Sequence, residues 1–485
     1  MTISKIKDIY NKDISEKVKW VIMAEQADDN TIYTELEEFV VTKEIHKHIK
    51  NFFDSYNNVN DNNKDTIWAW ISWFFGSWKS HLLKILSYLL ENREVKWKTP
   101  LAFFNEKLKD DQLLLWDITR AVSNTNVDVM LFNIDSRAWK NSKNHKDGIL
   151  EVFIKVFNEK LGYCSDIPWL ADFEHTLFMR WNYDKFKETF KSISWKNWDD
   201  EKDTFHFIRE NIIEALIKSD IMTEKDANYW FDGDGINYNM SVSKFAEIIK
   251  KYSEKRWKDH RVIFLVDEIG QYIWDDTALM LNLQTLVEDL WKELSWKAWV
   301  IVTSQEAIDS LTDIKGKDFS KIQWRFPTKL MLSSENTDEV IKKRLLEKTP
   351  EAEEFLEAYY IKNETIIKNL FSFSANTADM KIFKDMKDFW ATYPFIPYQF
   401  NLLQKVFEKI RVIWVAWSHI ADWNRSMLNG YQEAWSSILD ENIGTIIPFS
   451  SFYNTIEAFL SWEIKRTINW ANDNSMLEIM DSEVL

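Results

Sequence analysis

The chain alternates between two patterns of apolar residues. Short apolar runs of the length of buried strands lie at 66–75, 128–135, 262–267, 299–304 and 326–332. Segments with apolar residues at helical spacing lie between these runs, at 79–91, 148–161, 278–294 and in several pieces from 171 to 252. Buried strands that alternate with helices predict an α/β fold with a parallel sheet flanked by helices.

The same pattern predicts three parts. Residues 1–56 have amphipathic spacing and form an N-terminal helical element, followed by the polar, Asn-rich boundary 57–65. The α/β domain occupies 57–333 and contains a helical insertion at about 170–252. The strand pattern ends there, and 334–485 is expected to be a helical lid and C-terminal helical region. The final residues carry no helix-capping signal, so we expect the chain to be truncated within a longer protein.

Composition adds a second signal, because the chain has 9 Gly and 26 Trp. Average glycine usage of about 7% would give roughly 34 in a chain this long. We therefore expect many letters W to stand where the organism inserts glycine through a reassigned stop codon. Trp274, Trp291 and Trp296 lie at expected turns or helix ends, where glycine is preferred, whereas Trp70 and Trp299 lie in apolar runs and are read as genuine. The alternative is a Trp-rich binding surface.

Other bulk properties exclude several classes of protein. The longest apolar run, 67–78, is too short to span a membrane, and the N-terminus has no secretory signal. A single cysteine, Cys164, fits a reducing cytoplasm, and the scattered His residues do not suggest a metal cluster. The net charge of −16 argues against indiscriminate binding of nucleic acid. The basic stretch 250–261 is the best candidate for a local DNA contact, with a solvated helix end as the alternative.

The segment 66–90 carries the main chemical motif: an apolar strand, a short loop, and Lys79-Ser80 at the start of a helix. Read literally, it has no phosphate-binding motif. With glycine at 73 and 78 it becomes G-x-x-x-x-G-K-S, the Walker A motif of P-loop proteins. Lys79 would bind the β- and γ-phosphates of ATP, and Ser80 would bind Mg²⁺. The alternative is a chance strand before a Lys-Ser helix start. The remaining expected nucleotide-binding residues are Trp73, Phe74, Phe75, Gly76, Ser77 and Trp78.

A second motif follows the third apolar run, which ends in Asp267-Glu268. This is the Walker B pattern, in which a buried strand places two carboxylates beside the phosphate loop. Asp267 would hold Mg²⁺, and Glu268 would orient or deprotonate the attacking water. Paired acids also occur at ordinary strand ends, so the motif depends on the phosphate loop upstream.

Two further candidates resemble features of AAA+ ATPases. The run 298–304 ends in polar residues, and Thr303, Ser304 and Gln305 are candidate sensors of the γ-phosphate. With glycine at 324, the segment around Arg325 resembles the Gly-Arg-Phe box, which makes Arg325 a candidate arginine finger for a neighbouring subunit. The alternatives are a polar strand end without a catalytic role and an arginine paired with a nearby acid.

Longer strings carry a family resemblance. "TELEEFVVTKEIHKHIKNFFDSY", "FLVDEIGQYI", "LMLNLQTLVEDL", "VTSQEAID", "YPFIPYQFNLLQKVF" and "WNRSML" resemble the N-terminal portion of the BrxC family, the large P-loop ATPases of BREX (bacteriophage exclusion) antiviral defence systems. The resemblance spans nearly the whole chain. The following tryptophans fall where the family pattern has glycine: Trp68, Trp73, Trp78, Trp274, Trp291, Trp296, Trp324 and Trp417.

The resemblance implies a cytoplasmic, AAA+-like protein that binds ATP with Mg²⁺ and hydrolyses it, as a motor or switch. It also implies partnership with other BREX components, including a DNA methyltransferase and a phosphatase-like protein, and it leaves open a DNA contact and a homo-oligomer. The alternative function is a non-hydrolysing scaffold, stabilised by nucleotide, that binds DNA or protein.

Overall fold

The computed structural model describes most of the chain. The described residues are 3–11, 28–58, 68–73, 76–123, 126–138, 146–233, 240–257, 259–273, 276–304, 328–332, 337–371, 380, 382–414, 421–457 and 459–472.

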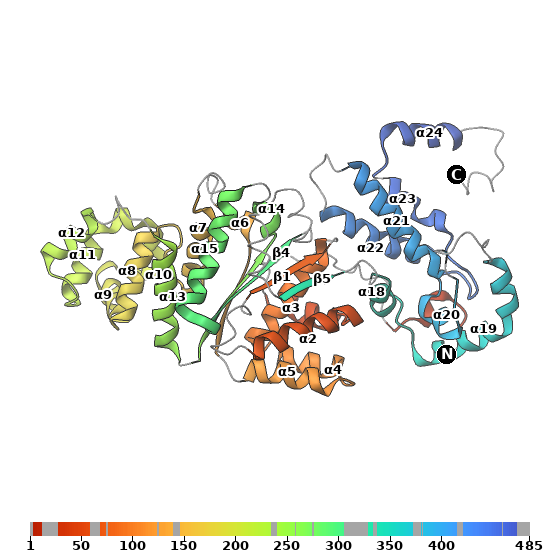
Figure 1. The fold of residues 1–485 in the computed structure, drawn as a ribbon, viewed down its shortest axis with the longest axis horizontal. Coiled ribbons are helices and arrows are strands. Elements are labelled where there is room, and N and C mark those ends of the chain that lie inside the picture. The colour runs from red at the N-terminus through yellow and green to blue at the C-terminus, as the bar shows by residue number, and fades with distance from the viewer. Residues whose placement is uncertain are drawn as a thin grey trace.

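A five-stranded sheet lies at the centre of the molecule (Figure 1). Its order is β2-β3-β4-β1-β5, and every neighbouring pair is parallel. The α/β fold with a parallel sheet is therefore confirmed, and each predicted strand overlaps an observed one. The strands are β1 (Trp68–Trp73), β2 (Val127–Asn133), β3 (Arg261–Asp267), β4 (Ala298–Ser304) and β5 (Thr328–Leu332).

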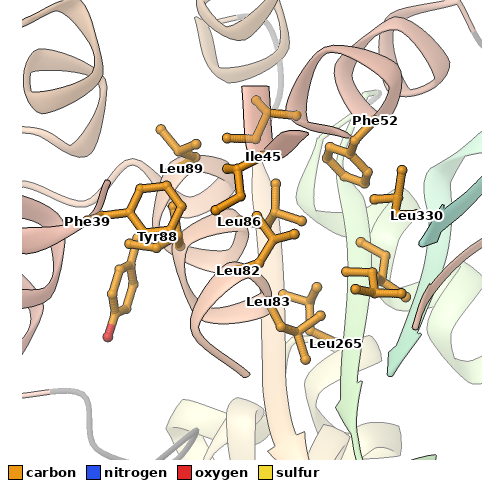
Figure 2. Close-up of a cluster of buried hydrophobic side chains, with 14 of the residues drawn as sticks. Phe39, Ile45, Phe52, Leu82, Leu83, Leu86, Tyr88, Leu89, Leu265 and Leu330 are labelled. Carbon is orange, nitrogen blue, oxygen red and sulfur yellow. The ribbon is translucent and has the colours of Figure 1, made fainter. Parts of the chain in front are cut away.

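Helices cover both faces of this sheet, which explains why its central strands β3 and β4 are apolar along most of their length. On one face, Leu82, Leu83 and Leu86 of α3 point toward Leu265 of β3 (Figure 2). On the other face, the ring of Phe264 packs 4.8 Å from that of Phe153 in α7. The helices on and around the first face are α1 (Asp29–Glu38), α2 (Lys43–Asn57), α3 (Gly76–Glu91), α4 (Pro100–Lys107) and α5 (Gln112–Ser123). The second face has α7 (Gly148–Leu161), α13 (Val242–Arg256) and α15 (Thr277–Leu294), while α6 (Ile134–Arg137) and α14 (Ile269–Ile273) follow β2 and β3.

The N-terminal region divides between two parts of the molecule. Helix α2 packs on the sheet, where Phe52 and Tyr56 contact the ring of Trp299 in β4. The first described segment, which contains the 3₁₀ helix Ile6–Ile9, instead joins the C-terminal helices. The ring of Tyr10 meets that of Trp435 edge-on, with centroids 4.8 Å apart. The described parts of residues 1–56 thus pack both on the sheet and on the C-terminal helices.

The helical insertion has a hydrophobic core of its own. The buried carboxylate of Glu174 lies within it and accepts hydrogen bonds from the Cys164 amide, the Tyr183 hydroxyl and the Trp198 indole, at 2.6, 2.7 and 2.7 Å. Burial raises the pKa of Glu174. The predicted insertion extends to about 252, but residues of α13 belong to the core around the sheet and not to this separate core. The helices of the insertion are α8 (Pro168–Met179), α9 (Tyr183–Ser194), α10 (Trp198–Glu201), the 3₁₀ helix Lys202–Ile208, α11 (Arg209–Lys218) and α12 (Glu224–Gly233).

The described residues after β5 form helices joined by loops. These elements form the body at the opposite end from the insertion (Figure 1). They are α18 (Thr337–Arg344), α19 (Pro350–Leu370), α20 (Met386–Thr392), α21 (Pro397–Trp414), α22 (Ala421–Ser436), the 3₁₀ helix Phe449–Phe452, α23 (Tyr453–Glu457) and α24 (Trp462–Asn472).

Two sets of tryptophans differ in backbone conformation and burial. Trp97, Trp181 and Trp195 have φ of +66°, +61° and +59° and expose 95%, 80% and 90% of their surface. Glycine is the residue that suits such positions. Trp70 and Trp299 are buried in β1 and β4, as expected for genuine tryptophans.

At three positions where glycine is expected in place of tryptophan, the structure shows no helix end or positive φ that would call for glycine. Trp68 is buried in β1, where a large apolar side chain fits. Trp291 lies inside α15, which ends at Leu294 as the apolar pattern at 278–294 predicts, so the helix end does not fall at Trp291 itself. The positive φ just beyond α15 belongs to Ser295 and not to Trp296.

Candidate functional site

The expected site residues gather at the carboxyl edge of the sheet. Strand β4 lies between β1 and β3 in the sheet. Its end therefore lies between the start of α3, which follows β1, and the two acids at the end of β3. In open parallel sheets, ligands bind outside this edge. The structure therefore brings Lys79, Ser80, Asp267, Glu268 and Thr303 into one region.

Asp267 is the centre of this group. The Ser80 hydroxyl donates a hydrogen bond to Asp267 Oδ2 at 2.5 Å, and the Thr303 hydroxyl donates one to Oδ1, also at 2.5 Å. Asp267 is only 3% exposed, so both contacts hold the carboxylate at the sheet edge. Three separate elements, α3, β3 and β4, are joined by these two hydrogen bonds.

Thr303 also fixes the backbone of the second acid. Its oxygen accepts a hydrogen bond from the Glu268 amide at 2.9 Å, and Asp267 Oδ1 accepts from the same amide at 3.1 Å. Glu268 has a φ of +61°, which is uncommon for a residue with a side chain and costs energy. The two acceptors hold this turn, in which the chain leaves β3 and enters α14.

Asn133 is a site residue that the sequence did not reveal. Its side-chain amide donates a hydrogen bond of 2.8 Å to Glu268 Oε2. The Asn133 oxygen accepts from the amides of Asp135 and Ser136 at 3.0 and 3.3 Å, and thereby caps α6. Because the cap uses the oxygen, the NH₂ group faces Glu268. The only sequence signal was a polar residue at the end of β2, which pairs in register with Asp267.

Lys79 lies in the first turn of α3 and is 1% exposed. A lysine ammonium is seldom buried to this extent, because its desolvation is costly. Helix α3 begins at Gly76, earlier than the predicted start at Lys79. In the sequence as printed, Ser77 and Trp78 lie between Gly76 and Lys79. Neither residue has the conformational freedom with which a glycine could leave the helix.

The three sensor candidates differ in surroundings. Thr303 contacts the acids, whereas the Ser304 hydroxyl accepts a hydrogen bond from the Trp70 indole at 2.8 Å. Ser304 also packs against Gly270, where an added Cβ would lie 2.5 Å from Ser304 Cβ. Gln305 and Arg325 lie outside the described residues, as do Phe74, Phe75 and the side chains of Trp73, Gly76, Ser77 and Trp78.

The basic stretch 250–261 has contacts within the chain. Lys250 and Lys251 form ion pairs with Glu293 and Glu247 at 3.2 and 2.6 Å. Lys255 lies over the Trp181 ring. These contacts favour the structural interpretation of this stretch over a DNA contact.

Two other searches concern only the part of the chain that the structure describes. There, no three or more His, Cys, Asp or Glu side chains come together as a metal site would require. None of the helices there is both long and apolar enough for a membrane span.

Comparisons with known proteins add no family assignment. No protein-family model matches the chain, and no solved structure matches it.

Proposed function

We propose that this protein binds ATP and hydrolyses it at the carboxyl edge of the sheet, as a P-loop NTPase of the AAA+-like type. The observation that carries the proposal is the hydrogen-bonded chain Ser80–Asp267–Thr303, with Glu268 beside it. A Walker A serine and a Walker B aspartate must lie together if they are to share one metal ion, and here their oxygens are 2.5 Å apart.

The donor set fits magnesium. Mg²⁺ prefers oxygen ligands and is usually held by one or two protein groups together with the phosphates of the substrate. The Ser80 hydroxyl and the Asp267 carboxylate supply such oxygens. When bound, Mg²⁺ neutralises negative charge on the phosphates.

The chain's own residues divide the remaining work. The Lys79 ammonium and the N-terminus of α3 place positive charge where the phosphates would bind. The Glu268 carboxylate accepts a proton from the attacking water, or orients that water. Asn133 and Thr303 act as positioning residues, because one holds the Glu268 side chain and the other holds its backbone.

The direct test starts from the Trp73→Gly/Trp78→Gly chain, because an indole at 78 would occupy the phosphate position in a Walker A loop. This chain should bind ATP in the presence of Mg²⁺, and the same chain with Lys79→Ala should lose most of that binding. Equilibrium binding of a fluorescent ATP analogue measures both. The proposal fails if neither chain binds, or if both bind equally well.

Hydrolysis needs its own test, because a nucleotide-stabilised scaffold would also bind ATP. In the Trp73→Gly/Trp78→Gly chain, called the glycine-restored chain below, Glu268→Gln should still bind ATP but should no longer hydrolyse it. A chain that binds ATP but releases no phosphate before or after this substitution would instead be the scaffold.

The sequence resemblance supports a role in a BREX defence complex, with the methyltransferase and the phosphatase-like protein as partners. The test is plating of phage on a host that carries the complete system. Lys79→Ala should abolish protection if ATP drives defence, and unchanged protection would contradict that role.

A further inference from the structure

We propose that Lys348 is a reactive amine, which forms a reversible imine with a small carbonyl compound in the cavity beside α18. The cavity has a volume of about 510 Å³, within the range of small-molecule sites. Its walls come from the segment between α1 and α2, the end of α4, the chain from α18 to the first turn of α19, and α20. None of the residues of the proposed ATP site lines it.

Lys348 is buried without an acidic partner. It is 4% exposed, and a lysine is seldom buried to this extent unless it is paired. Its Nζ donates a hydrogen bond of 2.8 Å to the backbone carbonyl of Tyr393 and lies 5.3 Å from the centre of the Tyr10 ring. No carboxylate of the described residues forms an ion pair with it. These contacts hold the side chain in place but supply no full negative charge to keep it protonated.

The surroundings favour the neutral form of this amine. Burial lowers the pKa of Lys348 well below its usual value of 10.5, and the charge of Glu353 only partly opposes this effect. The positive charge of Lys342 lowers the pKa further. A neutral amine has a free lone pair, and a desolvated lysine with such a lone pair is a nucleophile toward carbonyl groups.

The amine lies at the wall of the cavity. Lys348 is one of the lining residues, and so are Lys342 and Glu353, the two residues whose charges act on it. The carbonyl that its Nζ contacts belongs to Tyr393, two residues beyond the lining residue Ala391. A molecule in the cavity therefore lies next to the Lys348 side chain.

The rest of the lining favours an uncharged ligand with an apolar body. Charged side chains of the wall are already engaged within the protein, as in the ion pair of Lys343 with Glu339 at 2.8 Å, so a charged ligand would gain little. Six other lining residues are apolar and suit a hydrocarbon or aromatic group. We therefore expect a small aldehyde with an apolar body. The six residues are Phe39, Val40, Val41, Leu346, Trp390 and Ala391.

The chemistry needs no oxidant or reductant. The Nζ lone pair of Lys348 forms a C–N bond to the carbonyl carbon, and the carbon–oxygen double bond is replaced by a carbon–nitrogen double bond. The two hydrogens of the amine leave with the carbonyl oxygen as one molecule of water. Glu353, the lining carboxylate that acts on the amine, is the group that carries these protons from nitrogen to oxygen.

The experiment uses the full chain at pH 7, with benzaldehyde as the probe and sodium cyanoborohydride to reduce the imine to a stable secondary amine. Peptide mass spectrometry at short times measures the labelling rate of each lysine. Lys348 should be labelled about tenfold faster or more than exposed Lys185, because more of it is neutral amine at this pH. Its rate should also level off at a lower pH than that of Lys185, since an amine gains little neutral form above its own pKa.

Lys84 is the matched control for burial, because it is also buried but pairs with Glu35 at 2.8 Å. It should react no faster than Lys185. Lys348→Arg keeps a donor for the Tyr393 carbonyl and should remove the fast label. Val40→Trp fills the cavity and should slow the labelling of Lys348 but not that of Lys185.

Thermal unfolding checks that both variants fold, and the unsubstituted chain alone is enough to refute the site. A structural lysine at 348 would be labelled no faster than Lys185, which would overturn the proposal. Equal rates for Lys348 and Lys84, or a folded Val40→Trp chain in which Lys348 reacts as before, would overturn it as well. No nucleotide is present in the experiment, so its outcome is independent of the proposed ATP site.

Discussion

The side-chain amide of Asn133 donates a hydrogen bond of 2.8 Å to the carboxylate of Glu268. The two residues end neighbouring strands, β2 and β3, whose register places Asn133 opposite Asp267. Since the Asn133 oxygen is engaged in capping α6, the amide cannot turn over without loss of the cap. The Glu268 side chain is therefore held by a group whose own orientation is fixed.

Replacing Asn133 should lower turnover more than it lowers binding. In the glycine-restored chain, Asn133→Ala frees the Glu268 carboxylate, and loss of one orienting hydrogen bond should reduce kcat by about tenfold. The KM for ATP should change little, because the hydrogen bond of Asn133 acts on Glu268, the proposed catalytic group, and not on Lys79, the proposed phosphate-binding group. Steady-state phosphate release measures both constants. The control is Asn133→Ser, which can still cap α6. If the KM of Asn133→Ala rises by the same factor by which its kcat falls, the role of Asn133 is structural only.

Thr303 and Ser304 offer a comparison between neighbouring residues. Thr303→Val preserves the shape of the side chain but removes the hydroxyl that bridges Asp267 and the Glu268 amide. Turnover should fall by about tenfold or more, and stability by about 1–3 kcal/mol, because buried polar groups lose their partner. Ser304→Ala instead breaks the contact with Trp70, so it should reduce stability while turnover stays within about threefold. Phosphate release and urea unfolding separate these outcomes. Equal turnover in the two variants would contradict the proposed role of Thr303.

The sequence predicts the five strands because each one lies in a largely apolar run, and β3 and β4 are buried along almost their whole length. It also places Asp267 and Glu268, because two acids that directly follow such a run form a recognisable motif. The partner of Glu268 was not predictable, since the contact with Asn133 depends on the order and register of the strands. The contact of Tyr10 with Trp435 joins residues more than 400 positions apart, and no local pattern indicates it.

His175 should make the stability of the helical insertion depend on pH. It is buried, its Nε2 lies 3.0 Å from Asn158 Oδ1, and burial lowers its pKa from 6.5 to about 3. Between these two values the unfolded chain binds a proton that the folded chain does not. Stability should therefore fall as the pH decreases from 6.5 toward 3.

The measurement is urea unfolding at several pH values in this window, followed by tryptophan fluorescence. His175→Gln can retain a hydrogen bond to Asn158 but has no group that titrates. Its unfolding free energy should depend less steeply on pH, by up to about 1.4 kcal/mol per pH unit. Exposed His206 provides the control, and the same reduction in slope for His206→Gln would count against His175 as the cause.

Trp181 occupies a position that the chain elsewhere gives to glycine. Gly162 ends α7 with φ of +73°, and its amide and the next one donate to the carbonyls three and five residues earlier. Trp181 ends α8 with φ of +61° and the same pair of hydrogen bonds, to Phe178 and Leu177. This is the Schellman arrangement, in which glycine is the usual residue.

Glycine at such positions should stabilise the protein, which is the opposite of the usual result for removing a large apolar side chain. Trp181→Gly and Trp195→Gly each relieve a left-handed conformation at an exposed site and should raise the free energy of unfolding by about 1 kcal/mol. Trp198→Gly is the matched control, because Trp198 is 1% exposed and its indole donates to Glu174. That change should cost about 3–5 kcal/mol. Peptide mass spectra from the native host should accordingly show glycine at 181 and 195 and tryptophan at 198, and tryptophan at all three would contradict the reassignment.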